Sequence, residues 1–134
     1  MYEINFTVRD YECDLQGIVN NAVYLNYLEH ARHRFLKEIG FDFAQMHKEG
    51  IDAVAVRIEI DYKLALVSGD EFIIKTAIQR AGRLKLVFLQ EIYRLNDKKT
   101  VASAKTYAVC IKNSKPVLPQ DILKAVQSKY PYFE

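Results

Sequence analysis

Residues 12–39 join a short polar loop to a long helical pattern, and this stretch limits the possible folds more than any other. The loop, Asp14–Asn21, contains an acid, a glycine and two asparagines. From Ala22 to Ile39, apolar residues recur at three- and four-residue steps, which predicts one amphipathic helix. The predicted apolar stripe consists of Tyr24, Leu25, Leu28, Ala31, Phe35 and Ile39.

The polar loop places the carboxylate of Asp14 just ahead of the predicted helix start. Asn20 or Asn21 is a candidate N-cap, and Gly40 occupies the position where a left-handed residue often ends a helix. Free N–H groups at a helix start can hold an oxyanion, and an acid beside them can act as base or nucleophile. Acids also support helix ends without any catalytic role, and the pattern alone leaves both interpretations open for Asp14.

The rest of the chain alternates polar and apolar residues, as half-buried strands do. Five strands are predicted, over residues 3–9, 53–63, 71–80, 84–95 and 100–111. Short helices are predicted over residues 41–48 and 120–127. The order is a strand, the long helix and then four strands, which is typical of an α+β fold with a helix on an antiparallel sheet. Along the second strand, one face is predicted to carry Val54, Val56, Ile58 and Ile60.

Composition and charge exclude several classes of protein. A length of 134 residues suits one domain over residues 1–134. A net charge of +2, from 19 basic and 17 acidic residues, is no nucleic-acid footprint, and no apolar run approaches the ~18 residues of a membrane span. Cys13 and Cys110 are read as free thiols in a reducing compartment, so a cytoplasmic location is expected. Cys13 has no neighbouring histidine to activate it as a nucleophile.

Two histidines, His30 and His33, are three residues apart on the predicted helix. A zinc site needs a third or fourth ligand, and the only other histidine, His47, lies beyond that helix. No metal site is therefore predicted. The sequence also lacks a serine nucleophile elbow, a phosphate loop and a dinucleotide fingerprint.

The segment from Asp14 to Tyr24 resembles a known signature. Its sequence, Asp-Leu-Gln-Gly-Ile-Val-Asn-Asn-Ala-Val-Tyr, is similar to the D-x-x-G-H-V-N-N-x-x-Y motif of hotdog-fold acyl-CoA thioesterases of the 4-hydroxybenzoyl-CoA thioesterase-like, YbgC-type family. Ile18 replaces the histidine of that motif, as an apolar residue does in the hydroxybenzoyl branch. The similarity continues in the expected order at residues 56–62, 68–70, 82–83 and 102–105.

The resemblance implies a hotdog domain, in which an antiparallel sheet of about five strands wraps around one long central helix. It implies hydrolysis of an acyl-CoA without a cofactor, with Asp14 as nucleophile or general base and the backbone N–H of Asn21 as oxyanion donor. The residues expected to line the substrate site are Gly17, Ile18, Val19, Asn20, Tyr24, Val54 and Val56. The residues expected to bind the phosphates of coenzyme A are Arg83 first, then Lys85 and Lys63, with Lys105 and Lys112 as further candidates.

The resemblance also implies an assembly, a homodimer or a dimer of dimers with its active site between subunits. Two other functions stay open. One is an acyl-acyl carrier protein thioesterase, although the plant enzymes with a similar motif usually have two hotdog domains. The other is a non-catalytic acyl-CoA sensor on the same fold, since a fold does not determine a function.

Overall fold

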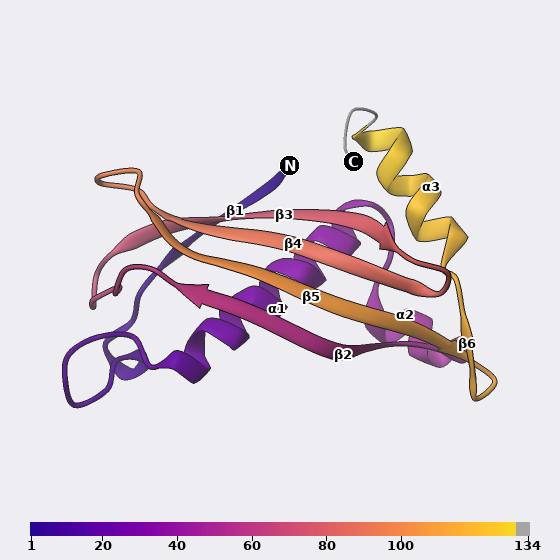
Figure 1. Ribbon diagram of the computed structural model, residues 1–134, viewed down its shortest axis with the longest axis horizontal. Coiled ribbons are helices and arrows are strands. Elements are labelled where there is room, and N and C mark those ends of the chain that lie inside the picture. The colour runs from indigo at the N-terminus through magenta and orange to yellow at the C-terminus, as the bar shows by residue number, and fades with distance from the viewer. Residues whose placement is uncertain (131–134) are drawn as a thin grey trace.

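The computed structural model describes residues 1–130, so the last four residues of the expected domain lie outside the described part. Six antiparallel strands form one sheet in the order β1-β3-β4-β5-β2, with β6 also paired to β5 (Figure 1). In chain order the elements are β1 (Tyr2–Thr7), the 3-10 turn η1 (Asp10–Glu12), α1 (Asn21–Glu38), α2 (Phe43–Lys48), β2 (Ile51–Tyr62), β3 (Glu71–Ala81), β4 (Lys85–Arg94), β5 (Thr100–Lys112), β6 (Lys115–Val117) and α3 (Gln120–Lys129). The predicted α+β class is confirmed.

Helix α1 begins and ends within one residue of the predicted range because its boundaries are set locally. The side-chain Oδ1 of Asn20 accepts the N–H of Ala22 at 2.9 Å, so Asn20 is the N-cap. Past the other end, Gly40 has a φ of +96°, which an L side chain would adopt only with strain. Asp42 caps α2 in the same way, through the N–H of Ala44 at 2.8 Å.

The buried face of α1 differs from the predicted stripe. Tyr27 and Leu36 are buried, whereas Leu25 is 38% exposed and the prediction for it is wrong. The buried set is Tyr24, Tyr27, Leu28, Ala31, Phe35 and Leu36. A helical pattern gives the period of the buried stripe, but which flank the sheet covers depends on how the helix is rotated against the strands.

Strand β2 contains a bulge that also corrects the prediction for its faces. The register places Val54 opposite Val109, Ala55 opposite Ala108, Arg57 opposite Tyr107 and Ile58 opposite Thr106. Val56 is therefore an extra residue, and a one-residue insertion exchanges the two faces of a strand. Ile58 and Ile60 lie on the face of the sheet that packs on α1, whereas Val54 lies on the outer face. The four residues do not share one face.

The core is divided into two apolar clusters along α1. The first surrounds the N-terminal half of the helix and includes Tyr24, Tyr27 and Phe72. The second surrounds the C-terminal half, where Met46 of α2 and Ile122 of α3 also pack. The expectation of one long central helix is thus met only in part, since α1 has 18 residues and shares the apolar side of the sheet with two shorter helices.

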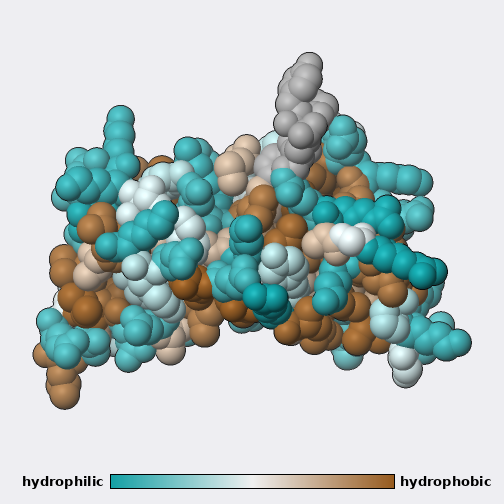
Figure 2. Space-filling view, in the orientation of Figure 1, coloured by the Kyte–Doolittle hydropathy of each residue, from teal (hydrophilic) through white to brown (hydrophobic). Residues whose placement is uncertain are grey.

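In Figure 1, α1 runs behind the strands, so the opposite face of the sheet is turned to the viewer. On this outer face apolar side chains alternate with polar and charged ones, and Figure 2 shows brown and teal atoms interleaved across it. None of the helices among the described residues is both long and apolar enough to cross a bilayer.

Candidate active site

The loop before α1 is folded around the carboxylate of Asp14. The Asp14 N–H donates to the Ile18 carbonyl at 2.8 Å, and the Gly17 N–H donates to the Asp14 carbonyl at 3.0 Å. Gly17 has a φ of +80°, so this tight turn favours glycine there. Oδ1 of Asp14 accepts the N–H of Gln16 at 2.9 Å, while Oδ2 has no hydrogen-bond partner among residues 1–130. One carboxylate oxygen is therefore available for chemistry.

Two further backbone bonds fix this loop in place. The Val19 N–H donates to the Leu66 carbonyl at 2.9 Å, and the Asn20 N–H donates to the Glu12 carbonyl at 3.1 Å. The first ties the loop to the segment after β2, and the second ties it to η1. Asp14 is thereby held beside the start of α1 by contacts with two other parts of the chain.

The first turn of α1 supplies a free donor. The N–H of Ala22 is bonded to the Asn20 side chain, and the N–H of Val23 donates to the Asn20 carbonyl at 2.9 Å. The N–H of Asn21 belongs to the first helical residue and so has no acceptor within the helix. It also lies at the positive end of the helix dipole, which favours a developing negative charge.

A depression with a volume of about 210 Å³ lies beside this N–H group. It is lined by Ile18, Val19, Asn21, Tyr24, Tyr62, Lys63, Leu64 and Ala65. The structure thus brings together four residues predicted to bind substrate or coenzyme A, Ile18, Val19, Tyr24 and Lys63, with Asn21, the predicted oxyanion donor. Three further lining residues, Tyr62, Leu64 and Ala65, were not predicted from the sequence.

Tyr62 connects the end of β2 to the helix start. Its hydroxyl donates to the Asn21 carbonyl at 3.2 Å, and its ring lies edge-on to Tyr24 with centroids 5.3 Å apart. Tyr62 is the last residue of the stretch 56–62 that resembles the family. That resemblance was the one signal in the sequence that could have identified Tyr62 as a site residue. Tyr62 fixes the distance between β2 and α1 at the candidate site.

The tyrosines below the depression act as neutral hydrogen-bonding groups. The Tyr24 hydroxyl accepts the N–H of Leu66 at 3.3 Å, and burial raises the pKa of Tyr24. The Tyr27 hydroxyl donates to Oε1 of Glu12 at 2.9 Å, and burial together with that carboxylate raises the pKa of Tyr27 far above its ordinary value. Both phenols stay protonated near neutral pH, so neither of them supplies a base.

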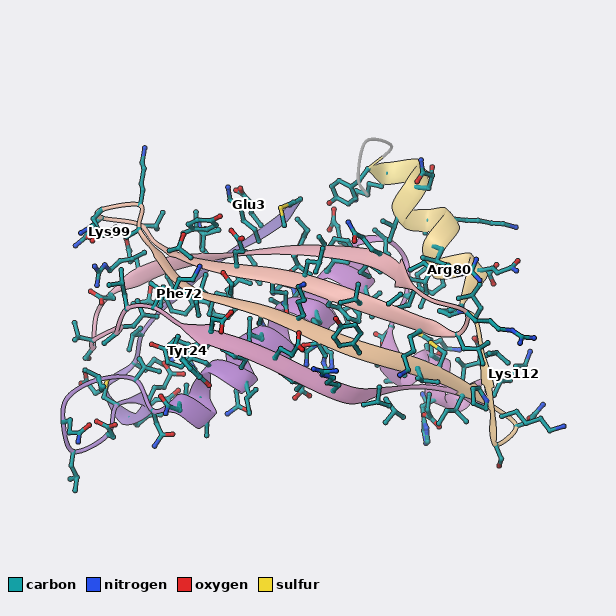
Figure 3. All side chains as sticks on the ribbon, in the orientation of Figure 1. Glu3, Tyr24, Phe72, Arg80, Lys99 and Lys112 are labelled. Carbon is teal, nitrogen blue, oxygen red and sulfur yellow. The ribbon has the colours of Figure 1, made fainter. Side chains whose placement is uncertain are left out.

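Four of the predicted residues lie at the other end of the sheet. Lys85 and Val54 both pair with Val109 of β5, whereas Tyr62 pairs with Ala102. Seven residues of strand separate these two rows, or roughly 23 Å at about 3.3 Å per residue. Within one copy of the chain, the residues Val54, Val56, Arg83 and Lys85 are therefore remote from Asp14. Figure 3 shows the two ends of the sheet, with Tyr24 toward one and Lys112 toward the other.

The remaining basic and histidine candidates are also dispersed. Lys105 lies on the outer face, opposite Glu59 and away from α1. His33 lies 3.7 Å from Glu29, and burial lowers the pKa of its imidazole. Within residues 1–130, no three side chains of the types that bind metals come together as a possible site.

Comparison with known proteins agrees with this geometry. Residues 8–126 match the family model of the thioesterase-like superfamily. The chain belongs to this superfamily. The match covers the Asp14 loop, all of α1 and every strand except β1.

Three similar proteins illustrate the likeness. The acyl-acyl carrier protein thioesterase ATL3 of Arabidopsis thaliana is 33% identical over 132 residues, which is 98% of this chain and 68% of that protein. The acyl-CoA thioesterase YbgC of Haemophilus influenzae is 28% identical over 90% of this chain and 92% of its own length. The crystal structure of a hypothetical protein from Aquifex aeolicus, AQ1494, superposes with a TM-score of 0.86 at 29% identity, covering 94% of this chain and 99% of that one. The sequence-based assignment to the YbgC-type thioesterases is confirmed.

Proposed function

We propose that this protein hydrolyses the thioester of an acyl-CoA to a free acid and coenzyme A. The observation that carries the proposal is the pairing of one open carboxylate oxygen, on Asp14, with the free N–H of Asn21. Asn21 lines a depression that could hold a thioester, and the backbone of Asp14 is bonded to Ile18, another residue of that lining. Relatives named as acyl-CoA thioesterases support the same reaction.

In this proposal the thioester carbonyl oxygen accepts a hydrogen bond from the Asn21 N–H, which stabilises the tetrahedral intermediate. One such donor typically raises kcat by roughly 10² to 10³. Asp14 has two possible roles. As a nucleophile it attacks the carbonyl carbon, expels the coenzyme A thiolate and leaves a mixed anhydride that water hydrolyses. As a general base it takes a proton from the attacking water, an effect worth about 10² to 10⁴.

We also propose that two copies of the chain complete the site. Strand β2 is a 12-residue edge of the sheet, with exposed apolar side chains at Val54, Val56 and Ile58. A long apolar edge is a template for pairing with another strand. Antiparallel pairing of β2 with its copy sets the start of one β2 beside the end of the other. Val54, Arg83 and Lys85 of one copy then approach Asp14 of its partner, in a dimer or a dimer of dimers.

An acyl-carrier-protein substrate is the second candidate, because ATL3 bears that name and is 33% identical. The expectation that such enzymes contain two domains does not exclude it. This chain spans 68% of ATL3, and the remaining third is too short for a second domain of this size. The two carriers share the same thioester chemistry and differ in what binds outside the depression.

A cytoplasmic location is part of the proposal. Cys13 and Cys110 are both unpaired, as is usual for proteins in a reducing compartment. Cys110 is buried, which raises the pKa of its thiol and makes it unreactive.

The test is thiol release from a panel of acyl-CoAs, from acetyl to palmitoyl with benzoyl and hydroxybenzoyl thioesters, and from matched acyl-carrier-protein thioesters. Asp14→Asn keeps the Oδ1 acceptor for Gln16 and removes the charge, so we expect turnover to fall by at least 10² with the fold intact. Asp10→Asn is the matched control, because Asp10 lies in the same region, accepts a hydrogen bond from Ser68 and is assigned no chemistry.

Turnover of acyl-CoA that is lost in Asp14→Asn and kept in Asp10→Asn supports the proposal. Turnover confined to carrier-protein thioesters moves the assignment to the second candidate. Normal rates in Asp14→Asn would exclude the mechanism, and stoichiometric binding of acyl-CoA without thiol release would identify a sensor.

A further inference from the structure

One charged side chain of α1 enters the core between the two apolar clusters. Nη1 of Arg32 donates to Oε1 of Gln90 at 3.1 Å and to Oγ1 of Thr106 at 3.2 Å. Gln90 is itself held, because its Nε2 donates to the Leu28 carbonyl at 3.0 Å and to Oγ1 of Thr76 at 3.1 Å. Gln90, Thr76 and Thr106 are each at most 1% exposed. The guanidinium is therefore fixed by a buried, fully bonded frame.

The charge of Arg32 is not matched by a carboxylate. No acidic side chain among residues 1–130 lies within ion-pair distance of it, and burial lowers its pKa, with Glu29 opposing that shift only in part. Enclosing a cation without a counter-ion is costly, and an apolar side chain of similar volume often serves stability as well or better. The guanidinium also lies over the Phe88 ring, 5.8 Å from its centroid, and this cation–π contact offsets part of that cost.

Some N–H groups of the guanidinium have no hydrogen-bond acceptor among residues 1–130. Of its five N–H groups, the two on Nη1 are bonded, and those on Nε and Nη2 have no acceptor among residues 1–130. No buried side-chain nitrogen in the described chain is without a partner, so these N–H groups are not sealed in the core. They therefore keep some exposure to solvent.

An apolar strip leads from the candidate active site to these donors. It consists of Tyr62, Ile60 and Ile58 on the inner face of β2, and Leu25 is a further exposed apolar residue on α1. Leu25, Ile58 and Tyr62 are each 38–46% exposed, and Ile58 is the cross-strand neighbour of Thr106, which binds Arg32. An acyl chain that starts at Asn21 beside Tyr62 would follow apolar side chains and end at the guanidinium.

Two independent lengths agree on the span of this strip. From Tyr62 to Ile58 is four residues of strand, or roughly 13 Å. From Asn21 to Arg32 is eleven residues of helix, or roughly 16 Å, and helical side chains lean back toward the N-terminus, which shortens the distance to the guanidinium. A compact aromatic acyl group held at Asn21 would not reach Arg32, whereas a medium-length aliphatic chain would.

We propose that Arg32 determines specificity by binding an oxygen at the far end of the acyl chain, roughly 13 Å from the thioester. A terminal carboxylate suits it best, since a guanidinium binds carboxylate through two parallel hydrogen bonds and the pair neutralises the enclosed charge. A terminal hydroxyl ranks second and a methyl group last. This inference rests on the proposed thioesterase function and names the class of acyl group that the same site would take.

The experiment compares three CoA thioesters of one chain length: decanoyl, ω-hydroxydecanoyl and the mono-thioester of decanedioic acid. For the unmodified protein we expect kcat/KM for the ω-carboxy ester to exceed that for decanoyl by at least tenfold, with the ω-hydroxy ester between them. Arg32→Gln keeps a polar side chain but removes the charge and the fork of donors that would bind a carboxylate, so the ratio should fall to about one. Arg32→Lys should retain part of the preference, and Arg34→Gln, which removes an exposed cation from the same helix, should retain all of it.

Because the readout is a ratio between substrates, a general loss of stability in Arg32→Gln would not imitate the result. A preference for decanoyl in the unmodified protein, or an unchanged ratio in Arg32→Gln, would overturn the inference. If neither these three esters nor any ester of the wider acyl-CoA panel is hydrolysed, the proposed function fails, and calorimetric binding of the three intact esters decides the question of Arg32. Equal affinities for all three would then refute its role.

Discussion

The two ends of α1 are built differently. At the N-terminal end, the loop tip Leu15 is fully exposed, the first-turn N–H of Asn21 is free, and a depression opens beside it. At the C-terminal end, Phe35 and Leu36 are 1% exposed beneath α2 and α3. The helix thus carries its candidate chemistry where backbone donors are free and the dipole is positive, and its densest packing where neither is needed.

The largest stability effect should come from the closed end. Phe35 packs edge-on against Tyr2 at 5.4 Å and within the second apolar cluster, so Phe35→Ala should lower the free energy of unfolding by about 3–5 kcal/mol. Urea unfolding followed by circular dichroism measures this. The folded fraction should hydrolyse thioesters within a few-fold of the normal kcat/KM. A loss below about 1 kcal/mol, or a folded but inactive protein, would contradict the division between the two ends.

The second prediction concerns the proposed dimer, in which a second copy of the chain completes the candidate site. Val56 is the extra residue of the β2 bulge and is 50% exposed, so Val56→Asp would place two like charges near the axis of the proposed dimer. We expect at least a tenfold weaker dimer, or about 1.4 kcal/mol, together with loss of turnover. Sedimentation over a range of concentrations measures this, with Val56→Ala as the uncharged comparison. A protein that is monomeric and fully active would show that one copy suffices.

The smallest expected effects come from removing the N-caps of two helices, α1 and α2. Asn20→Ala removes the acceptor for the Ala22 N–H and should cost about 1 kcal/mol of stability. It should also lower kcat several-fold, since the same turn presents the Asn21 donor. Asp42→Ala removes the cap of α2 at the closed end and should destabilise the protein without changing turnover. Equal effects of the two substitutions on kcat would mean that the first cap serves stability alone.

Local signals made much of the fold predictable. The range 22–39 was within one residue of Asn21–Glu38 because a cap, a period and a terminal glycine all lie within that stretch. The bulge at Val56 was invisible, since β2 keeps an apolar residue at alternate positions on both sides of it. Face assignments after such an insertion depend on which residue of β5 lies opposite, which is a property of the folded sheet.

The candidate site was predictable to the extent that it is contiguous in sequence. Asp14 and Asn21 are seven residues apart, and Asp14 pairs with Ile18 in the loop that leads into α1. Arg32 was missed because its partners, Gln90 and Thr106, lie 58 and 74 residues further along the chain. The predicted substrate and phosphate residues Val54, Arg83 and Lys85 stay predictions, since only the arrangement of two copies can bring them to Asp14.

The layer formed by Thr76, Gln90, Arg32 and Thr106 has a further consequence for how the helix finds its place. A purely apolar helix could slide along an apolar sheet by one turn, about 5.4 Å, and still bury a similar area. The hydrogen bonds of Gln90 to the Leu28 carbonyl and of Arg32 to Gln90 are made at one longitudinal position only. Any shifted arrangement would break both bonds and leave Gln90 enclosed with only its Thr76 partner on β3, at a cost of about 1–3 kcal/mol for each lost bond. The polar layer thereby selects a single alignment of α1 on the strands, and with it the placement of Asn21 opposite Tyr62.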